Sequence, residues 1–217
     1  MKTFKKLAFT ATALAVAAIG VGCATGPSPA ELDREALQVI RGAFRDEGIV
    51  KVTRLDQDAA NEACSKALGK EPPPEVVKAI EAANLKTIKP PSDGKYLGDW
   101  KLGEAIAQSG RGMTWTDDAK TVNGGNCYNC HQISKQEISF GTIGPSLYNY
   151  GKLRGVTDPN SPASMPIVEY TWGKLWNARA YNACSQMPRA GHKGVLTEQQ
   201  VKHIMALLLD PKSPVNQ

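Results

Sequence analysis

Cys127, Cys130 and His131 form a Cys-x-x-Cys-His motif, and no other residues in the chain have a spacing with such clear chemical meaning. The two cysteines are three residues apart, so on one helical turn both sulfurs can reach the two vinyl groups of a haem and form thioether bonds. The histidine that follows presents its imidazole to the iron. The motif therefore predicts one covalently attached haem c, with His131 as the proximal ligand.

Other roles of a Cys-x-x-Cys pair are a disulfide, a zinc site and a redox-active dithiol. Zinc requires two further Cys or His ligands, and the remaining Cys64, Cys184, His192 and His203 show no paired zinc spacing. A thioredoxin-like dithiol belongs in a βαβ context, which this sequence does not suggest. Haem attachment is therefore the favoured interpretation.

The distal iron ligand is sought among the methionines and histidines outside the motif: Met113, Met165, Met187, Met205, His192 and His203. Met205 falls in the apolar stripe of the last predicted helix and is expected in the core. Met113 precedes the motif, and Met165 is a weaker alternative. Met187 is favoured, because a loop at this position can pass beneath the haem and deliver a thioether sulfur. Arg189, close by, is expected to contact a haem propionate or a partner protein.

Residues 1–22 have the pattern of a secretory signal peptide, three lysines followed by an uncharged, largely apolar stretch over residues 7–21. Gly20-Val21-Gly22-Cys23 resembles the bacterial lipoprotein signal, in which the cysteine becomes acylated. Ordinary cleavage after Ala24 is the competing prediction. Both predict export to the periplasm, and a lipid on Cys23 is the one membrane attachment that the sequence suggests.

The formal charge does not suggest a nucleic-acid partner. Residues 1–22 carry three lysines and no acid, so their removal lowers the net charge from +5 to +2. Haem propionates bring that value closer to neutrality. The mature chain therefore lacks the basic excess with which proteins attract nucleic acids.

Periodicity predicts an all-α protein, with helices over residues 29–46, 56–68, 73–84, 98–109 and from Thr197 onward. The first has Ser28 and Glu31 as a capping box, and the last has Thr197 and Gln200. The last helix is expected to bury Val201, Ile204, Met205 and Leu208. The stretch from the haem motif to about residue 196 is rich in turn signals. Lys89–Gly94 is a polar, proline-containing break, taken as the boundary between a helical N-terminal extension over 28–94 and a cytochrome domain over 95–217.

Cys64 and Cys184 remain once the motif and Cys23 are set aside. An exported protein seldom keeps two free thiols, so a disulfide between them is attractive, and it would tie the extension to the loop that carries Met187. Two buried free thiols, or a Cys184 that assists a partner subunit, are the alternatives. The sequence alone does not fix the geometry that decides among them.

Residues 95–217 resemble SoxX, the small cytochrome subunit of the SoxAX complex of bacterial sulfur oxidation. The resemblance rests on the segments 125–131, 141–147, 184–189, 196–200 and 206–216. It implies a class I cytochrome c fold with crossed N- and C-terminal helices. It also implies that Pro145, in Gly144-Pro145-Ser146-Leu147, offers its backbone carbonyl to the second ring nitrogen of His131.

The resemblance further implies a place in an enzyme, L-cysteine S-thiosulfotransferase, which joins thiosulfate oxidatively to a cysteine of the carrier SoxYZ. The catalytic site is expected on a SoxA-like subunit. This chain would accept the electrons and pass them to a small soluble cytochrome c. The alternative function is a free-standing periplasmic electron carrier without an enzymatic partner. A haem sensor or peroxidase-like enzyme needs an open iron position, against which a Met187 ligand argues.

Overall fold

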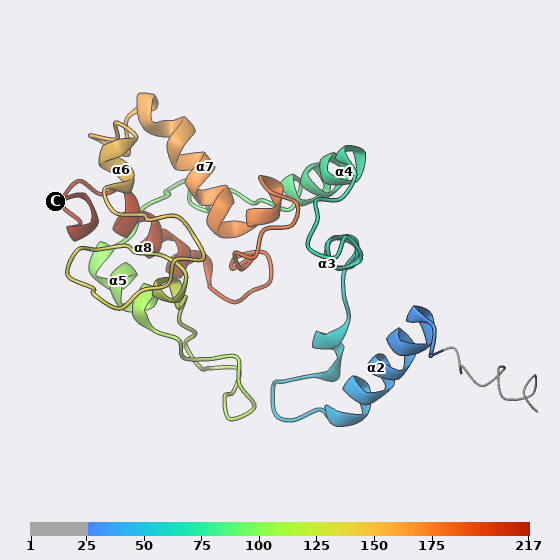
Figure 1. Cartoon of the computed structure of the whole chain (residues 1–217). Coiled ribbons are helices and arrows are strands. Elements are labelled where there is room, and N and C mark those ends of the chain that lie inside the picture. The colour runs from blue at the N-terminus through green and yellow to red at the C-terminus, as the bar shows by residue number, and fades with distance from the viewer. Residues whose placement is uncertain (1–25) are drawn as a thin grey trace, which may run out of the picture. The chain divides into compact units, whose positions relative to one another are not determined.

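The computed structural model describes residues 26–217, and these residues are helical (Figure 1). The α-helices are α2 (Pro29–Ala43), α3 (Ala59–Lys66), α4 (Pro74–Leu85), α5 (Trp100–Gln108), α6 (Tyr150–Leu153), α7 (Met165–Trp176) and α8 (Glu198–Leu209). Short 3-10 turns are η1 (Val52–Leu55), η2 (Cys127–Asn129), η3 (Pro162–Ser164), η4 (Ala178–Ala180) and η5 (Pro214–Asn216). Over this range β-pairing is limited to one isolated bridge between Glu47 and Val50. The all-α prediction is confirmed.

The chain divides into two compact units, one ending at Arg45 and one formed by Asp46–Gln217. The first contains α2, every residue of which is exposed. Its predicted capping box is confirmed, since the Ser28 hydroxyl accepts from the Glu31 N–H and the Glu31 carboxylate accepts from the Ser28 N–H. Several of its exposed side chains are apolar, including Leu32, Val39 and Ile40. Residues 1–22 and Cys23, predicted as signal and lipidation site, lie outside the described residues.

The core of the second unit forms around α8. Its predicted capping box is confirmed, because the Thr197 hydroxyl and the Gln200 amide each satisfy a backbone N–H of the other residue. The predicted stripe is also confirmed: Val201, Ile204, Met205 and Leu208 are at most 4% exposed. Leu207 and Leu209 are buried as well. The helix is thus covered on nearly all sides rather than on one face.

Helix α5 packs directly against α8, and a glycine makes the approach possible (Figure 1). A Cβ atom on Gly103 would overlap the carbonyl group of His203 in α8. At the start of α5, the Gly98 N–H donates to the Lys202 carbonyl at 2.9 Å, and the Asp99 N–H donates to His203 Nδ1 at 2.8 Å. The two backbones therefore meet without intervening side chains.

Helix α7 was not anticipated, since the sequence indicated only turns in this region. It begins at Met165, has Pro166 in its first turn, and buries Val168, Trp172 and Leu175. These three positions are four and three residues apart, a helical spacing that the neighbouring turn signals obscured. The helix completes the core beside α8.

The break at Lys89–Gly94 does not separate two units, which corrects the predicted boundary between 28–94 and 95–217. The Trp172 indole N–H donates to the Lys89 carbonyl at 2.7 Å, and the Trp176 indole N–H donates to the Thr87 carbonyl at 3.0 Å. The side-chain amide of Asn177, which is fully buried, donates to Asn84 Oδ1 at 2.9 Å. These bonds join α4 and the segment after it to α7, so residues 46–94 belong to the same unit as 95–217.

The α5–α8 contact generates a stability prediction. Gly103→Ala places a methyl group against helix backbone that cannot move aside, and overpacking of this kind costs about 1–3 kcal/mol, more than the gain in helix propensity. Urea unfolding is expected to show a lower midpoint with an unchanged slope. Gly42→Ala in α2 is the control, because a Cβ there meets nothing within 4 Å. Equal midpoints for the two variants would contradict the close crossing.

Candidate haem site

The Cys-x-x-Cys-His motif forms a single tight turn in the structure. Cys127 begins the short helix η2, and its carbonyl accepts from the N–H groups of Cys130 and His131 at 3.1 and 3.0 Å. Both cysteines are free thiols and both are partly exposed. Asn126 precedes the turn in the left-handed conformation, with φ of 51°. The two sulfurs thus come from one turn, the arrangement that attachment to two haem vinyl groups requires.

Tyr128, between the two cysteines, anchors this turn to α5. Its ring is buried, and its hydroxyl donates to Glu104 Oε1 at 2.8 Å and lies 3.1 Å from the Ser134 hydroxyl. Burial, with the hydrogen bond to Glu104, raises the pKa of Tyr128 to about 12. Burial also raises the pKa of the Cys127 thiol, to about 11. Both groups are therefore protonated at neutral pH.

His131 is oriented by Pro145, which the resemblance places opposite its ring, and by the neighbouring Gly144. Its Nδ1 lies 2.7 Å from the Pro145 carbonyl oxygen, so the nitrogen carries the proton and donates to that oxygen. Gly144 lies flat against the imidazole, where a Cβ would overlap the ring atoms. No described residue forms a hydrogen bond with Nε2. The ring is held through one nitrogen, and the other is left to act as a ligand.

These residues fit a haem better than a bare metal ion. Across residues 26–217 no group of three or more His, Cys, Asp or Glu side chains is gathered as a metal site. A haem brings four nitrogen ligands of its own and needs only axial ligands from the protein. One histidine with a fixed tautomer and two cysteines on the adjoining turn meet that need, whereas zinc would lack ligands.

The structure separates the candidates for the distal ligand. Met205 is fully buried in α8, and Met165 begins α7. The imidazole of His203 is engaged at both nitrogens, by the Asp99 N–H and by Gln199. Met187 is partly buried, packs against the main core and lies in an irregular segment. Of the candidates compared here, Met187 alone combines a core contact with a position outside the helices.

Met113 and His192, the two remaining candidates for the distal ligand, are less suitably placed. The Met113 sulfur accepts a hydrogen bond from the Asn123 amide at 3.5 Å, and its backbone has a positive φ of 67°. His192 is exposed as a residue, but partial desolvation of its ring, with the nearby charges of Lys193 and Arg189, lowers its pKa. Neither packs against the core beside the motif.

Cys64 and Cys184 are joined by a disulfide, with an S–S distance of 2.07 Å and Cα atoms 5.6 Å apart. The two residues are 120 positions apart in the chain. In the chain-entropy model a crosslink over such a loop stabilises the fold by on the order of 5 kcal/mol. The disulfide connects α3 to the segment that carries Met187.

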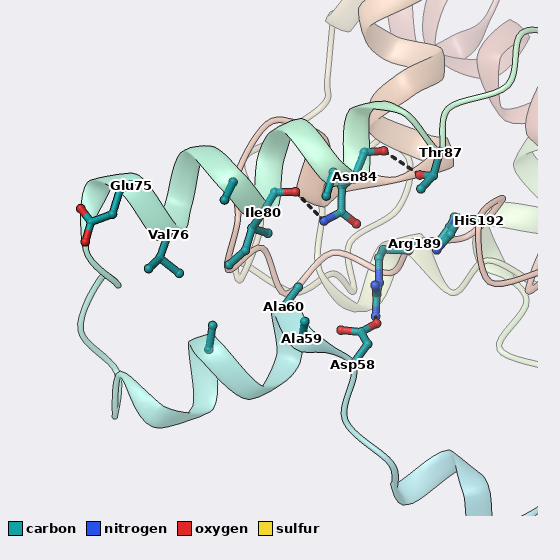
Figure 2. Close-up of a pocket in the computed structure, with 13 residues that line it drawn as sticks. Asp58, Ala59, Ala60, Glu75, Val76, Ile80, Asn84, Thr87, Arg189 and His192 are labelled. Atoms are coloured by element: carbon teal, nitrogen blue, oxygen red, sulfur yellow. Dashed lines mark hydrogen bonds and ion pairs between the residues drawn. The ribbon is translucent and has the colours of Figure 1, made fainter.

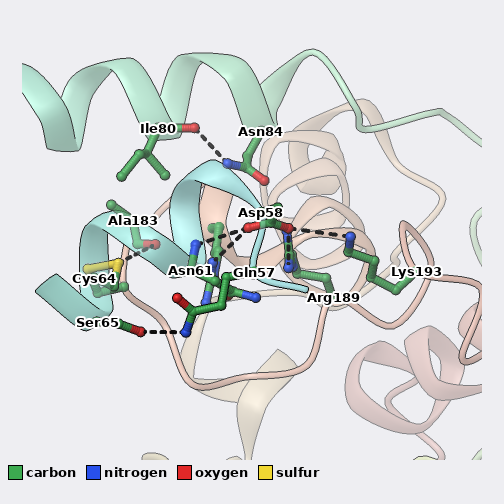
Figure 3. A network of polar contacts seen from close by, with 12 residues as sticks. Gln57, Asp58, Asn61, Cys64, Ser65, Ile80, Asn84, Ala183, Arg189 and Lys193 are labelled. Atoms are coloured by element: carbon green, nitrogen blue, oxygen red, sulfur yellow. Dashed lines mark hydrogen bonds and ion pairs between the residues drawn. A yellow bond between two sulfur atoms is a disulfide. The ribbon is translucent and has the colours of Figure 1, made fainter. Parts of the chain in front are cut away.

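Arg189 pairs with a carboxylate of the protein itself. Its Nη2 lies 2.7 Å from Asp58 Oδ2, and its side chain is only 11% exposed (Figure 3). Lys193 Nζ lies 3.4 Å from the same oxygen, and Arg179 Nη1 lies 3.7 Å from Oδ1. The sequence predicts a contact of Arg189 with a haem propionate or a partner protein. In the structure this guanidinium faces the N-terminus of α3.

Asp58 is the residue of this region that the sequence analysis did not single out. The predicted helix began at Asp56, whereas α3 begins at Ala59 and Asp58 is its N-cap, accepting from the Asn61 N–H at 3.0 Å. Asp followed by two alanines is a recognisable cap signal. The pairing with Arg189 has no signal in the sequence, because 131 residues separate the partners.

A groove of about 530 Å³ runs between α3 and α4 (Figure 2). Apolar side chains line most of it, among them Ala60, Val76 and Ile80, and the Asp58–Arg189 pair closes one side. None of the motif residues lines this groove. Arg189 and His192, from the segment that carries Met187, do line it.

Comparison with known proteins identifies one relevant relative. The chain is 34% identical over 167 residues to an uncharacterized lipoprotein of Aquifex aeolicus (strain VF5), in an alignment that covers 74% of this chain and 73% of the lipoprotein. No family model matches the chain. Among the helices of residues 26–217, none has the length and apolar character needed to cross a membrane.

The Asp58 cluster predicts a pH dependence of stability. Partial burial acts to raise the pKa of Asp58, but the Asn61 N–H and the Arg189 guanidinium outweigh it and lower the pKa to about 2. A carboxyl group whose pKa is lower in the folded state stabilises the fold above its unfolded value of about 3.9, and this stabilisation is lost as the pH falls toward 2. Asp58→Asn should therefore be less stable at neutral pH and lose less on acidification.

Urea unfolding between about pH 7 and pH 3 measures this difference. Asparagine keeps the helix cap, so the comparison isolates the charge. Glu62→Gln is the matched control, because it removes the exposed ion pair with Lys66 within the same helix. If Asp58→Asn and the wild type give parallel curves of stability against pH, the cluster does not hold Asp58 ionised.

Proposed function

The chain belongs to the family of the Aquifex aeolicus lipoprotein, and from this premise we propose that it is an exported, lipid-anchored c-type cytochrome that transfers electrons through one haem. Cys127 and Cys130 supply the thioether bonds. His131 and Met187 would ligate the iron. The N-terminal anchor is Cys23, consistent with the name of the relative and with the lipoprotein pattern at Gly20–Cys23.

The hydrogen bond of 2.7 Å between His131 Nδ1 and the Pro145 carbonyl carries this proposal. A ligating histidine almost always donates its other ring N–H to a fixed acceptor, which sets the tautomer and the ring orientation. Here the acceptor lies fourteen residues away and the adjoining Gly144 has no side chain to obstruct the ring. A disulfide-forming or redox-active dithiol would need no such arrangement around the neighbouring histidine.

A haem with histidine and methionine ligands supplies a one-electron couple, with the thioether favouring the ferrous state and a raised potential. The protein residues position that couple rather than carry out bond chemistry. Tyr128 fixes the cysteine turn on α5, and Pro145 fixes the imidazole. The partly buried Met187 would supply a thioether to the iron, and an iron so ligated favours electron transfer over binding of a substrate.

Within this function we propose the SoxX role as the specific form. Its support is the sequence resemblance over residues 95–217, including the segments that carry Pro145 and Met187. The chain would accept electrons from thiosulfate conjugation to SoxYZ at a SoxA-like subunit and pass them to a small cytochrome c. The close crossing of α5 and α8 agrees with the crossed terminal helices of the class I cytochrome c fold that the resemblance implies. A free-standing electron carrier is the alternative.

Haem attachment is tested by expressing the full chain with a periplasmic c-type maturation system and staining a denaturing gel for haem. Wild-type protein is expected to retain the stain after denaturation, because thioethers survive it. The double variant Cys127→Ala/Cys130→Ala should lose the stain entirely. Cys64→Ala/Cys184→Ala, which removes the other two described cysteines, should keep it. Absence of covalent haem in the wild type sinks the proposed function.

The specific role is tested by copurification from native membranes and periplasm. A tagged chain should recover a second cytochrome with SoxA-like sequence in equal amount, and thiosulfate should reduce its haem only when that subunit and SoxYZ are present. Recovery as a monomer that exchanges electrons with small cytochromes c, from cells without such a subunit, would favour the free carrier instead.

A further inference from the structure

The segment from Cys184 to Lys193, which carries Met187, is fastened to α3 at two places. Before Met187, Cys184 forms the disulfide with Cys64, in the last turn of α3. After Met187, Arg189 pairs with Asp58, at the first turn of the same helix. Figure 3 shows both contacts arising from one short helix.

The ion pairs between this segment and α3 all involve the carboxylate of Asp58. Asp58 Oδ2 receives Arg189 at 2.7 Å and Lys193 at 3.4 Å, and Asp58 Oδ1 accepts from the Asn61 N–H at 3.0 Å. The Arg189 side chain is 11% exposed and the Asp58 side chain is 35% exposed, so the pair is partly shielded from solvent. It is less exposed than the Lys66–Glu62 pair of the same helix, whose side chains are 74% and 54% exposed.

The helix that bears both fastenings is itself packed against its surroundings. Ala60 on α3, Ile80 on α4 and Ala183 beside the disulfide form a small buried cluster. Asn84 of α4 is hydrogen-bonded to Asn177, which follows α7. The fastenings therefore connect the Met187 segment to a part of the fold with its own core, and not to a freely moving arm.

We propose that Asp58 and the Cys64–Cys184 disulfide form a clamp that positions Met187 for the iron. This inference rests on the proposed function, in which Met187 is the distal ligand. Met187 lies three residues after Cys184 and two before Arg189. A segment held at both ends has few conformations to lose, so the entropy of ordering it is paid during folding and does not oppose ligation.

The clamp also gives residues 46–66 a role that a detachable arm would not have. The chain that leads into α3 is hydrogen-bonded to the region before the haem motif, since the Arg54 guanidinium donates to the Met113 carbonyl at 2.9 Å. Asp58 and Cys64 then act on residues more than 115 positions further along the chain. Asp58 touches neither the motif nor Met187 and is a positioning residue.

Ligand competition on the full-length haem protein tests the clamp. The ferric forms of the wild type, Asp58→Asn and Glu62→Gln are titrated with imidazole. The readout is the charge-transfer band at the red end of the spectrum, which reports the bond between the Met187 sulfur and the iron. Asp58→Asn releases the Arg189 end of the segment, while the disulfide still holds the other end. The variant should bind imidazole roughly 5- to 30-fold more tightly than the wild type, the effect of losing one or two kcal/mol of positioning. Glu62→Gln, which keeps the clamp, should bind it as the wild type does.

A double-mutant cycle separates the clamp from a direct role of Arg189 at the haem. If Arg189 acts through Asp58, then Arg189→Gln, Asp58→Asn and the double variant give the same imidazole affinity. Additive effects mean that the two residues act independently, and they overturn the clamp. Hydrogen exchange at residues 185–193 is a second readout, with faster exchange expected in Asp58→Asn.

The reference variant Met187→Ala keeps the outcomes distinguishable. If Met187→Ala loses the charge-transfer band, Met187 is the ligand and the proposed function stands. If Asp58→Asn and Glu62→Gln then bind imidazole with equal affinity, the clamp is overturned. An unchanged band in Met187→Ala means that another residue is the ligand, and it overturns the clamp together with that part of the proposed function. Circular dichroism confirms that each variant is folded before comparison.

Discussion

The close approach of α5 to α8 is the constraint on which the candidate site depends. Gly103 permits it, because any side chain there would meet the backbone of the facing helix. The segment leading into the cysteine turn is then bonded to both helices. The Gly125 N–H donates to the Ile106 carbonyl of α5 at 2.8 Å, and the Gln200 amide of α8 donates to the Asn123 carbonyl at 2.6 Å. The turn has little regular structure of its own, and the two helices hold it in place.

Local signals allowed the starts of α2 and α8 to be predicted from the sequence. Ser28 and Thr197 act through side-chain bonds to backbone groups three residues away, so a short stretch of sequence contains the whole interaction. Helix α7 was missed for the opposite reason. Its stability comes from burial of Trp172 among residues distant in sequence, while its own neighbourhood is dense with prolines and turn formers. The boundary at Lys89–Gly94 was misplaced likewise, because indole hydrogen bonds from α7 fix that stretch.

In the candidate site, too, contacts between residues close in sequence were easier to predict than contacts between distant residues. The contact of His131 with Pro145 spans fourteen residues, and the motif and the resemblance together indicated it. The pairing of Asp58 with Arg189 spans 131 residues and depends on where α3 is placed by the fold. A sequence shows that both residues are charged but not that they meet. Contacts within one turn or one loop were therefore predictable, and the cysteine count also indicated the Cys64–Cys184 link to the segment of Met187. The ionic pairing of Asp58 with Arg189 required the structure.

The disulfide has a consequence for how the chain matures. Among the described residues there are four cysteines, which can pair in three ways, and the Cys-x-x-Cys pair lies inside the covalent ring that Cys64 and Cys184 close. Only a thiolate attacks a disulfide, and Cys127, with a pKa of about 11, is almost entirely a thiol at neutral pH. The described cysteines are thus already sorted into one bridged pair, which ties α3 to the segment of Met187, and one pair of free thiols on a single turn.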